Sequence, residues 1–391
     1  MRVLAITKIF PNSLEPTSSP FNRQQFTELA KLCDLTVLEA IPYFPGAETT
    51  GQPPRAAKLA LLPRSERISG IETVYMRTAY MPVVGLGFAG PLYLASLMPY
   101  LEMASRFDVI LGTWAYPDGC AAVAFAKMLR KPCVVKVHGS DINVLGKLRG
   151  ANRFMAICLP RADALVAVST PLVQGLLWKG CDAAKIKLVP NGVNAELFYP
   201  RDRGEARTKL GVPLDRPLAL YVGRLEETKG VGDLLEAFAD LREKKPGVML
   251  ALVGADLMPE RIAAARAAFG DALITPGIVT HEGIADWMAA CDVFTLPSWA
   301  EGTPNVILEA LASGRPPVGT RVGGIPDIIE DGKNGILARS KDPRGLVYSI
   351  LSAFARKWDP EALRATAPGS WSDSASKLYD VLEGAARAHA S

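Results

Sequence analysis

Two nearby glutamates, Glu301 and Glu309, stand in the segment Ser298-Trp-Ala-Glu-Gly-Thr-Pro-Asn-Val-Ile-Leu-Glu309. An ionised carboxylate has several lone pairs and can accept hydrogen bonds from two hydroxyl groups on adjacent carbons. The pair therefore suits recognition of a sugar or ribose better than recognition of an anion. The alternative is that Glu301 caps a turn and that Glu309 is a solvated residue on a helix surface.

The loop that holds Glu301 is predicted to join a strand to a helix. Apolar and β-branched residues in 291–296 predict a buried strand, and the apolar spacing of 306–312 predicts a helix. We expect Thr303 to cap this helix with its hydroxyl and Pro304 to occupy its first turn. The free amide groups at such a helix start favour a phosphate or an electron-rich sugar oxygen.

Two cations follow another predicted strand, 218–222, at the positions Arg224 and Lys229. Side chains at the carboxyl end of a strand in a doubly wound sheet face the usual ligand position, where these two could clamp a diphosphate. The alternative is a solvated basic turn, because Glu226 and Glu227 are close neighbours.

Two further motifs lie in the first half of the chain. His138-Gly-Ser-Asp141 follows the predicted strand 132–137, which places an imidazole at a strand's carboxyl end. Pro190-Asn191-Gly192-Val193-Asn194 predicts a sharp turn at the end of a domain. A lone histidine is more often structural, and the turn could be a simple linker.

Length and composition restrict the class of protein. The 391 residues exceed what one core supports, and 49% hydrophobic residues suffice for two. A net charge of +4, with acids and bases interspersed, does not indicate a nucleic-acid partner. Three histidines make a zinc site an unfavoured interpretation. Six scattered cysteines indicate buried thiols in a reducing compartment: Cys33, Cys120, Cys133, Cys158, Cys181 and Cys291.

Strands and helices alternate along the chain, which predicts parallel β-α-β units and an α/β fold with two Rossmann-like, doubly wound sheets facing across a cleft. The predicted strands of the first half are 3–7, 35–39, 71–76, 108–112, 132–137, 164–168 and 186–189. Those of the second half are 218–222, 248–253, 272–275, 293–296 and 317–319.

Prolines and charges between the two series set the predicted boundaries. The predicted parts are a Rossmann-like first domain 1–192, a linker 193–216, a Rossmann-like second domain 217–370 and a C-terminal helix 371–391. This helix either returns to the first domain or stays with the second.

Residues 78–101 carry no charge, but their prolines and glycines argue against a membrane-spanning helix. The segment 80–101 either packs in the core or contacts a membrane surface.

Gly85-Leu-Gly87-Phe-Ala-Gly90 matches a dinucleotide fingerprint only formally, because no regular strand precedes it. The first strand starts at the N-terminus with no leader pattern before it, so we expect a cytoplasmic protein.

In their order, these motifs resemble family 4 glycosyltransferases. The resemblance rests on Glu301 and Glu309, on Gly223-Arg224 with Lys229, on the His138 loop, on Pro190-Asn191-Gly192-Val193, and on Gly323-Gly324-Ile-Pro326. The segment Phe10-Pro11 and the Phe21-x-x-Gln24-Gln25 helix are most similar to the bacterial members that build cell-surface polysaccharides, including those of the teichuronic acid type.

The resemblance implies a GT-B fold, with the acceptor on the first domain and a UDP- or GDP-sugar on the second. It implies retention of anomeric configuration without a metal or other cofactor, and no Asp-x-Asp motif is present. The implied catalytic residues are His138, Arg224, Lys229 and Glu301. The implied donor contacts are Asp141, Asn191, Gly223, Gly277, Ile278, Gly302, Thr303, Asn305, Val306 and Glu309.

Two positions depart from the family pattern. Pro304 stands where glycine is common, so one backbone donor to the sugar is missing. Ser18-Ser19-Pro20 replaces glycines that relatives often place near the phosphate.

The expected function is therefore transfer of a hexose from a nucleoside diphosphate sugar to a growing, lipid-linked cell-surface glycan. The enzyme is expected in the cytoplasm or at the inner face of the plasma membrane. Removal of Arg224 or Lys229 is expected to depress turnover strongly. The alternatives are a nucleotide-sugar 2-epimerase and a catalytically silent nucleotide-sugar binding protein.

Overall fold

The computed structural model describes residues 1–16, 18–44, 46, 49, 51, 54–79 and 89–390. The chain divides into two compact units. Unit 1 comprises Met1–Asn191 and Trp371–Ser391, and unit 2 comprises Gly192–Ser370. The C-terminal helix thus belongs to unit 1, the first of the two alternatives. Each unit is described by itself below.

Unit 1 is built on an eight-stranded sheet with the order β3-β4-β2-β1-β5-β6-β7-β8. All neighbouring pairs are parallel except β3 and β4, which are antiparallel. Its strands are β1 (Arg2–Thr7), β2 (Asp34–Tyr43), β3 (Ser65–Ile68), β4 (Ile71–Ala79), β5 (Val109–Thr113), β6 (Cys133–Val137), β7 (Ala164–Ala167) and β8 (Ile186–Leu188). Parallel strands covered on both faces are apolar throughout, which explains why the sequence predicted most of them.

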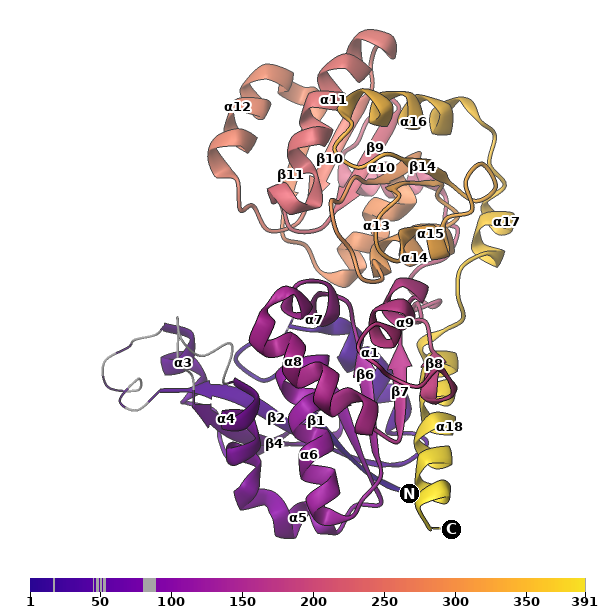
Figure 1. Cartoon of the computed structure of the whole chain (residues 1–391). Helices are drawn as coiled ribbons and strands as arrows, with labels where there is room; N and C mark the ends of the chain where they lie inside the picture. Colours follow the sequence, from indigo (N-terminus) through magenta and orange to yellow (C-terminus); the bar gives the residue numbers. More distant parts are fainter. Residues whose placement is uncertain are drawn as a thin grey trace. The chain divides into compact units, whose positions relative to one another are not determined.

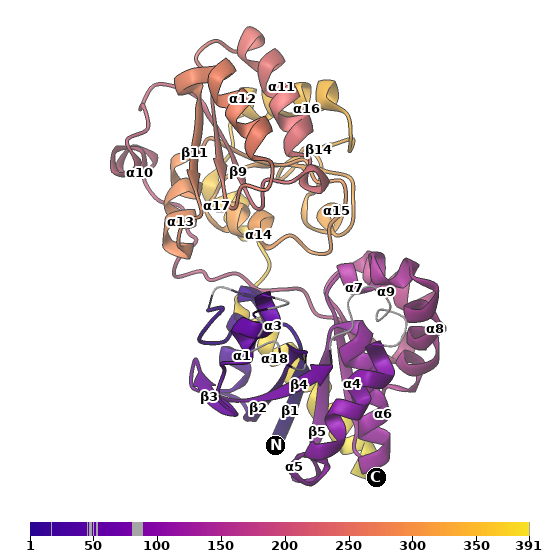
Figure 2. The ribbon, with the colours of Figure 1, turned by 90° about the vertical axis from the view of Figure 1, so that its left-hand side faces the viewer.

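Helices cover both faces of this sheet, because alternate side chains of a strand point to opposite faces. The helices are α1 (Pro20–Leu29), α3 (Pro54–Leu59), α4 (Ala89–Leu97), α5 (Leu101–Ser105), α6 (Cys120–Leu129), α7 (Ser140–Asn143), α8 (Arg149–Cys158), α9 (Thr170–Leu177) and α18 (Trp371–Ala390). Val3 and Ala5 share one core with α1 and α18, whereas Leu4 and Ile6 share another with α4, α6 and α8. Figures 1 and 2 show α18 lying along this unit.

Part of the uncharged segment packs in the core of unit 1. Tyr93 and Leu97 of α4 are 2% and 0% exposed and belong to the same core as α6. Residues 80–88, which include most of the Gly85–Gly90 motif, lie outside the described residues. Among the described helices, none combines the length and the apolar character that crossing a membrane requires. A contact between this segment and a membrane surface stays a prediction.

Unit 2 is built on a six-stranded, fully parallel sheet with the order β11-β10-β9-β12-β13-β14. Its strands are β9 (Leu218–Val222), β10 (Met249–Val253), β11 (Leu273–Gly277), β12 (Val293–Leu296), β13 (Pro317–Thr320) and β14 (Ile336–Ala338). Its helices are α10 (Arg203–Leu210), α11 (Val231–Lys244), α12 (Pro259–Phe269), α13 (His281–Ala290), α14 (Asn305–Ala312), α15 (Ile325–Ile328), α16 (Pro343–Ala355) and α17 (Pro360–Ala365).

The prediction that residues 193–216 form an irregular linker was wrong. This segment contains helix α10, whose first turn is capped by Asp202 through the amide of Glu205. Phe198 is 0% exposed and belongs to the core of unit 2. The charged run in this segment suggested a solvated linker, but burial of Phe198 and Arg207 fixes it to the unit.

Both sheets reverse their strand order at one place. In unit 1 this topological switch point lies between β1 and β5, and in unit 2 between β9 and β12. Loops that leave the carboxyl ends of the two strands at a switch point diverge, so ligands of doubly wound sheets bind there. The loops after β9 and β12 carry Lys229 and Glu301, and His138 follows β6 in unit 1.

Candidate functional site

The loops after β9 and β12 meet in an ion pair between Lys229 and Glu301. Lys229 Nζ lies 2.7 Å from Glu301 Oε1, and the two side chains are 23% and 10% exposed. Ser298 Oγ donates to the same oxygen at 2.7 Å. Both donors thus use Oε1, and neither of these two bonds involves Oε2. The sequence predicted both charged residues but missed Ser298 as their partner.

Two glycines allow these loops to approach each other closely. Gly230 has φ +69°, and a Cβ there would lie 2.0 Å from the carbonyl oxygen of Pro297. Gly323 has φ +52°, and a Cβ there would lie 2.0 Å from the carbonyl oxygen of Glu301. Any other residue at either position would displace the backbone that holds Glu301. The glycines of the two motifs therefore position this carboxylate.

Helix α14 starts one residue later than the sequence suggested. Its first residue is Asn305, and Pro304 is the N-cap, with φ −79° and ψ 105°. The prediction that Thr303 caps the helix and that Pro304 lies in its first turn was therefore wrong. Proline has no amide hydrogen to donate, and as the N-cap it leaves the helical ladder intact. The predicted donor contacts Gly302, Thr303, Asn305 and Val306 are all partly exposed around this helix start.

Glu309 lies further inside α14 and contacts a histidine that the sequence analysis did not single out. His281 Nε2 lies 3.1 Å from Glu309 Oε1, with side-chain exposures of 25% and 12%. The ring of Phe198 packs edge-on against this imidazole at a centroid distance of 5.0 Å. Glu309 is therefore a partly buried acceptor with a fixed neighbour, which argues against the interpretation of a solvated helix residue. No periodicity marks His281, because it is the first residue of α13.

Of the predicted base-reading residues, Gly277 is the last residue of β11, and Ile278 follows it, three residues before His281. Gly277 has φ +78°, and its carbonyl accepts a hydrogen bond from the Gly254 amide at 2.9 Å. Ile278 is 77% exposed. An exposed apolar side chain after a strand's carboxyl end can cover the face of a planar ring.

Arg224 does not share the environment of Lys229. Its NH2 group pairs with Glu226 Oε1 at 2.9 Å, and its side chain is 64% exposed. The preceding Gly223 has φ +155°, and its carbonyl oxygen lies where a side chain at Gly254 would clash. The Arg224 carbonyl accepts a hydrogen bond from Tyr221 at 2.7 Å. The backbone of this turn is thus fixed. The guanidinium group, in contrast, is exposed and paired with Glu226, as the alternative interpretation of a solvated basic turn predicts.

In unit 1, the imidazole ring of His138 packs against two aromatic rings. Its ring centroid lies 5.1 Å from that of Phe21 and 6.0 Å from that of Trp114. Its Nε2 atom is buried and has no hydrogen-bond partner among the described residues. Burial, followed by the charge of Lys136, lowers the pKa of His138 well below its ordinary value. The imidazole is therefore neutral at pH 7 and has an unused nitrogen.

Asp141 organises this loop from within. It is 0% exposed and accepts hydrogen bonds from the amides of Ala115 at 2.8 Å, Gly139 at 2.6 Å, Ile142 at 3.1 Å and His138 at 3.2 Å. These bonds occupy both carboxylate oxygens, so the structure gives Asp141 a positioning role. Its predicted direct contact with the donor stays untested. Asn191, the other predicted contact in unit 1, is 5% exposed.

A buried chain of polar groups links β6 to the returning helix α18. Lys136 is 0% exposed and donates to the side-chain oxygen of Gln25. Gln25 Nε2 donates to Ser374 Oγ at 2.9 Å, and this hydroxyl donates to the Pro190 carbonyl at 2.7 Å. Burial lowers the pKa of Lys136 to about 7. No sequence pattern indicated this lysine's role, because its strand is otherwise apolar.

A cavity of about 230 Å³ opens at the carboxyl edge of the unit 1 sheet. Apolar residues dominate its lining, which also includes Lys8, Glu39 and Tyr93. Glu39 is 3% exposed, and its Oε2 atom is buried without a hydrogen-bond partner among the described residues. Burial raises the pKa of Glu39 to about 9 and that of the neighbouring Asp118 to about 6. Glu39 is therefore a neutral acid at pH 7 that can donate and accept a hydrogen bond.

Two doubly wound units, one with a cation and carboxylates at its switch point, define the GT-B class of glycosyltransferases. The solved structure of Anabaena HepE with UDP is similar over 100% of this chain and 98% of its own, with 21% identity and a TM-score of 0.69. The same protein with UDP-glucose gives a TM-score of 0.68. These likenesses establish the fold.

The family follows from the sequence comparisons. The model of Glycosyltransferase Family 4 matches residues 28–197, and that of Glycosyl transferases group 1 matches residues 216–356. The chain therefore contains one glycosyltransferase domain of each kind, and the two matches lie in its two halves. A candidate teichuronic acid biosynthesis glycosyltransferase, TuaC of Bacillus subtilis (strain 168), is 28% identical over 92% of this chain and 91% of its own length. A D-inositol 3-phosphate glycosyltransferase of Streptomyces avermitilis is 32% identical over 58% of this chain and 53% of its own.

The structure brings the predicted residues of unit 2 together in part. Lys229 contacts Glu301 directly, Glu309 lies beyond them in α14, and Gly277 and Ile278 precede its partner His281. Residues His138, Asp141 and Asn191 belong to unit 1. Among the described residues, no group of three His, Cys, Asp or Glu side chains could hold a metal ion. Metal independence stays a prediction.

Proposed function

We propose that this glycosyltransferase moves a hexose from a nucleoside diphosphate sugar to a growing, lipid-linked cell-surface glycan with retention of configuration and without a metal. The observation that carries the proposal is the contact between Lys229 and Glu301 next to the start of α14. HepE, which shares the fold, binds UDP and UDP-glucose, which supports a donor of this class. The similarity to TuaC supports a cell-surface glycan as the product.

In this proposal Lys229 binds the diphosphate and Glu301 binds hydroxyls of the sugar. The bond between the anomeric carbon and the diphosphate oxygen breaks as the acceptor oxygen forms the new bond on the same face, and the proton of the acceptor hydroxyl passes to the departing diphosphate. Negative charge then builds on the departing diphosphate, and a partly buried ammonium stabilises it more than water does. The amides at the start of α14 add donors for the same charge.

Glu309 binds the ribose hydroxyls in the proposal, with His281 fixing its orientation. Ile278 covers the base. Neutral His138 of unit 1, whose Nε2 has no partner among the described residues, is assigned to the sugar's reacting face.

The cavity beside Glu39 is assigned to the acceptor. Its apolar lining suits the apolar part of a lipid-linked glycan, and a neutral carboxyl group can bind a hydroxyl without an ionic partner. The enzyme is placed in the cytoplasm or at the inner face of the plasma membrane, where nucleotide sugars and lipid carriers meet.

The test is incubation of the full-length protein with radiolabelled UDP- and GDP-sugars, with and without a bacterial membrane lipid extract. We expect label in the lipid fraction, undiminished by a metal chelator, and nuclear magnetic resonance of the product should show the donor's anomeric configuration. An epimerised donor without transfer would show the alternative 2-epimerase. Binding of donor without any conversion, in the presence of extract, would show a silent binding protein.

A further inference from the structure

A second cavity lies in unit 2, at the opposite edge of its sheet from Lys229 and Glu301. Its volume is about 340 Å³, within the range of small-molecule sites. Pro217, Asp292 and Pro316 line it, and each immediately precedes a strand, β9, β12 or β13. The cavity is thus at the amino ends of the strands, and neither the fold's usual ligand position nor the proposed function accounts for it.

Cationic side chains dominate the charge of this cavity, which we call the basal cavity. Its lining includes two carboxylates, Asp215 and Asp292. The cationic residues of the lining are Arg203, Arg207, Arg216, Lys245, Arg315 and Arg356. They come from α10, from the turns that follow α11 and α16, and from the turns that precede β9 and β13, so distant segments converge on one charge cluster.

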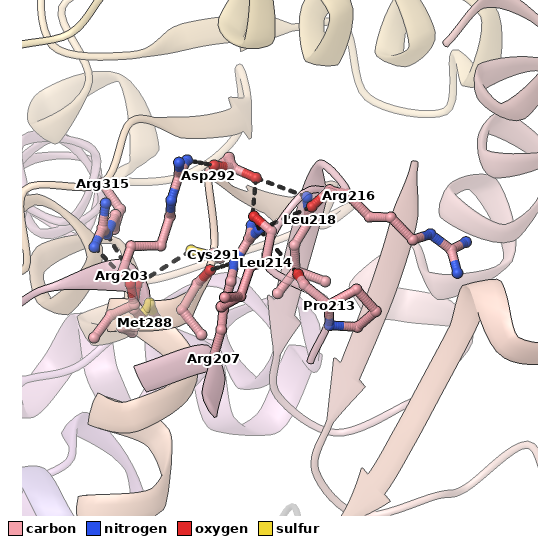
Figure 3. Close-up of polar contacts among 12 residues, drawn as sticks. Arg203, Arg207, Pro213, Leu214, Arg216, Leu218, Met288, Cys291, Asp292 and Arg315 are labelled. Atoms are coloured by element: carbon pink, nitrogen blue, oxygen red, sulfur yellow. Dashed lines mark hydrogen bonds and ion pairs between the residues drawn. The ribbon is translucent and has the colours of Figure 1, made fainter. Parts of the chain in front are cut away.

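One of these cations has a structural role. Arg207 is 1% exposed, and its NH1 group donates to the carbonyls of Pro213, Leu214 and Arg216. Its NH2 group pairs with Asp292 Oδ2 at 2.7 Å. Figure 3 shows Arg203 reaching the same carboxylate, which also accepts the Leu218 amide at 2.8 Å. Asp292 is therefore fully used by neighbouring donors.

Three other cations have no carboxylate partner within 4 Å among the described residues: Lys245, Arg315 and Arg356. Arg315 donates only to carbonyls, those of Met288 at 3.2 Å, Ala289 and Arg201. Lys245 Nζ lies 5.2 Å from the ring centroid of Phe354, and the Arg356 guanidinium lies 4.5 Å from that of Trp358. Carbonyls and aromatic faces hold these groups in place but leave their charges uncompensated.

The charges also act on one another. Burial lowers the pKa of Arg315, and the charges of Arg203 and Arg207 lower it further. Like charges close together in a cavity repel one another. A bound anion therefore reduces this electrostatic repulsion and also accepts hydrogen bonds. Guanidinium groups match the geometry of phosphate oxygens.

We propose that the basal cavity is a second anion site, which binds a phosphate- or diphosphate-bearing molecule through Arg203, Lys245, Arg315 and Arg356. Because it lies at the amino ends of the strands, it is separate from the donor site and does not depend on the proposed reaction. The phosphate can belong to a free metabolite or to a lipid headgroup, and these two sources make the same contacts.

The first test measures binding of inorganic pyrophosphate to the full-length protein by calorimetry. The double variant Lys245→Gln/Arg356→Gln removes two exposed or half-exposed cations of the cavity. The matched control is Lys244→Gln/Lys357→Gln, which removes the same charge from neighbouring residues outside the lining. Both doubles keep Lys229, so any binding at the donor site contributes equally to the two.

We expect the cavity variant to bind pyrophosphate at least about tenfold more weakly than wild type, and the control to differ by less than about twofold. Lys245→Arg/Arg356→Lys, which keeps both charges, should retain binding. Equal weakening in the cavity variant and the control would show general electrostatic attraction and overturn the proposal. So would unchanged binding in a cavity variant whose melting temperature matches wild type.

A second arm distinguishes the two sources of phosphate. Wild type, cavity variant and control are sedimented with phosphatidylglycerol vesicles and with neutral phosphatidylcholine vesicles. Binding to the anionic vesicles that is lost only in the cavity variant would support the site and identify a headgroup. Pyrophosphate binding that depends on the cavity, without such vesicle binding, would support the site and identify a free phosphate compound.

Discussion

The carboxyl edges of the two sheets handle charge in opposite ways. In unit 2, Lys229 and Glu301 are paired with each other, and Glu309 contacts His281, all with some exposure to solvent. In unit 1, Glu39 is buried and His138 is half-buried against aromatic rings, and each has a polar atom without a hydrogen-bond partner among the described residues. One edge therefore keeps charge, whereas the other keeps ionisable groups neutral.

The difference follows from the surroundings and not from the residue types. A partner at 2.7 Å compensates Glu301 for partial burial. Within the described part of the chain, the one hydrogen-bond partner of the Glu39 carboxyl group is Asn12, whose Nδ2 lies 3.4 Å from Oε1. Burial without a cation favours the protonated acid. A charged edge suits a diphosphate, and a neutral edge suits the hydroxyl groups of an acceptor. The predictions below test whether the two edges differ in this way.

Removal of the paired cation should have the largest effect. Lys229→Ala is expected to lower kcat by about 10²- to 10³-fold, the range seen when one transition-state donor is lost. Steady-state kinetics measure this loss with the donor sugar that the radiolabel assay selects. The control Lys333→Ala removes an equally charged, 72% exposed lysine of the same unit and should retain wild-type turnover.

The same substitution leaves Glu301 without its cation, so folding needs its own check. Lys229→Ala/Glu301→Gln removes both charges and should restore the melting temperature without restoring activity. Wild-type turnover in Lys229→Ala would show that the ion pair between Lys229 and Glu301 is structural. Lys229 would then have no role in catalysis.

Glu39→Gln should reveal the neutral edge through the pH dependence of stability. The pKa of Glu39 is raised to about 9 in the folded protein, against an ordinary value of 4.5. Between these values the unfolded chain releases a proton that the folded protein keeps, so stability falls as pH rises, by at most about 1.4 kcal/mol per pH unit. Glutamine cannot ionise, so the variant should lose this component.

The measurement is the free energy of unfolding by denaturant for wild type and Glu39→Gln between pH 5 and pH 8. Other groups with shifted pKa values, such as Asp118, Lys136 and His138, contribute to both proteins and cancel in the difference. The free energy of unfolding of Glu39→Gln, relative to that of wild type, should therefore increase with pH. A difference that stays constant across this range would mean that Glu39 is ionised in the folded protein.

The sequence predicted the unit 2 edge better than the unit 1 edge, for a physical reason. Lys229 and Glu301 lie in loops, where charged residues next to glycines already indicate a site. Glu39 and Lys136 lie inside apolar strands, and only the packing of several elements around them shows that they are buried. His281 was missed because its partner Glu309 comes from another helix.

The fold shows the same limit. Strands buried on both faces were predicted because they are continuously apolar, as in β1 or β12. The edge strand β3, Ser65-Glu-Arg-Ile68, alternates between exposed and half-buried residues and gave no such signal. Helix α10 was missed because its mostly charged residues suggested a linker, although Arg207 is held by carbonyls and by Asp292.

Glu309→Gln should have a moderate effect that separates donor binding from chemistry. The amide keeps one acceptor oxygen but loses the charge that strengthens hydrogen bonds from hydroxyl groups. We expect the KM for the donor to rise about tenfold, with kcat nearly unchanged, because a ribose contact is the same before and during transfer. His281→Gln, which removes only the neighbour of Glu309, should change KM in the same direction by less. A fall in kcat at constant KM would place Glu309 at the reacting sugar instead.

Arg224→Ala should have the smallest effect, and it sharpens the contrast within the charged edge itself. The sequence placed Arg224 beside Lys229 as an equal member of a clamp, whereas the structure pairs it with Glu226 in a 64% exposed position. Solvent screens an exposed pair strongly, so the loss should be about threefold in kcat/KM, against the far larger loss for Lys229→Ala. The measurement is kcat/KM for both variants at low and at high salt, and the quantity compared is the ratio of their losses relative to wild type. If Arg224→Ala matches Lys229→Ala, the guanidinium must leave Glu226 and reach the diphosphate when the donor binds, and the turn after β9 acts as a moving part of the site.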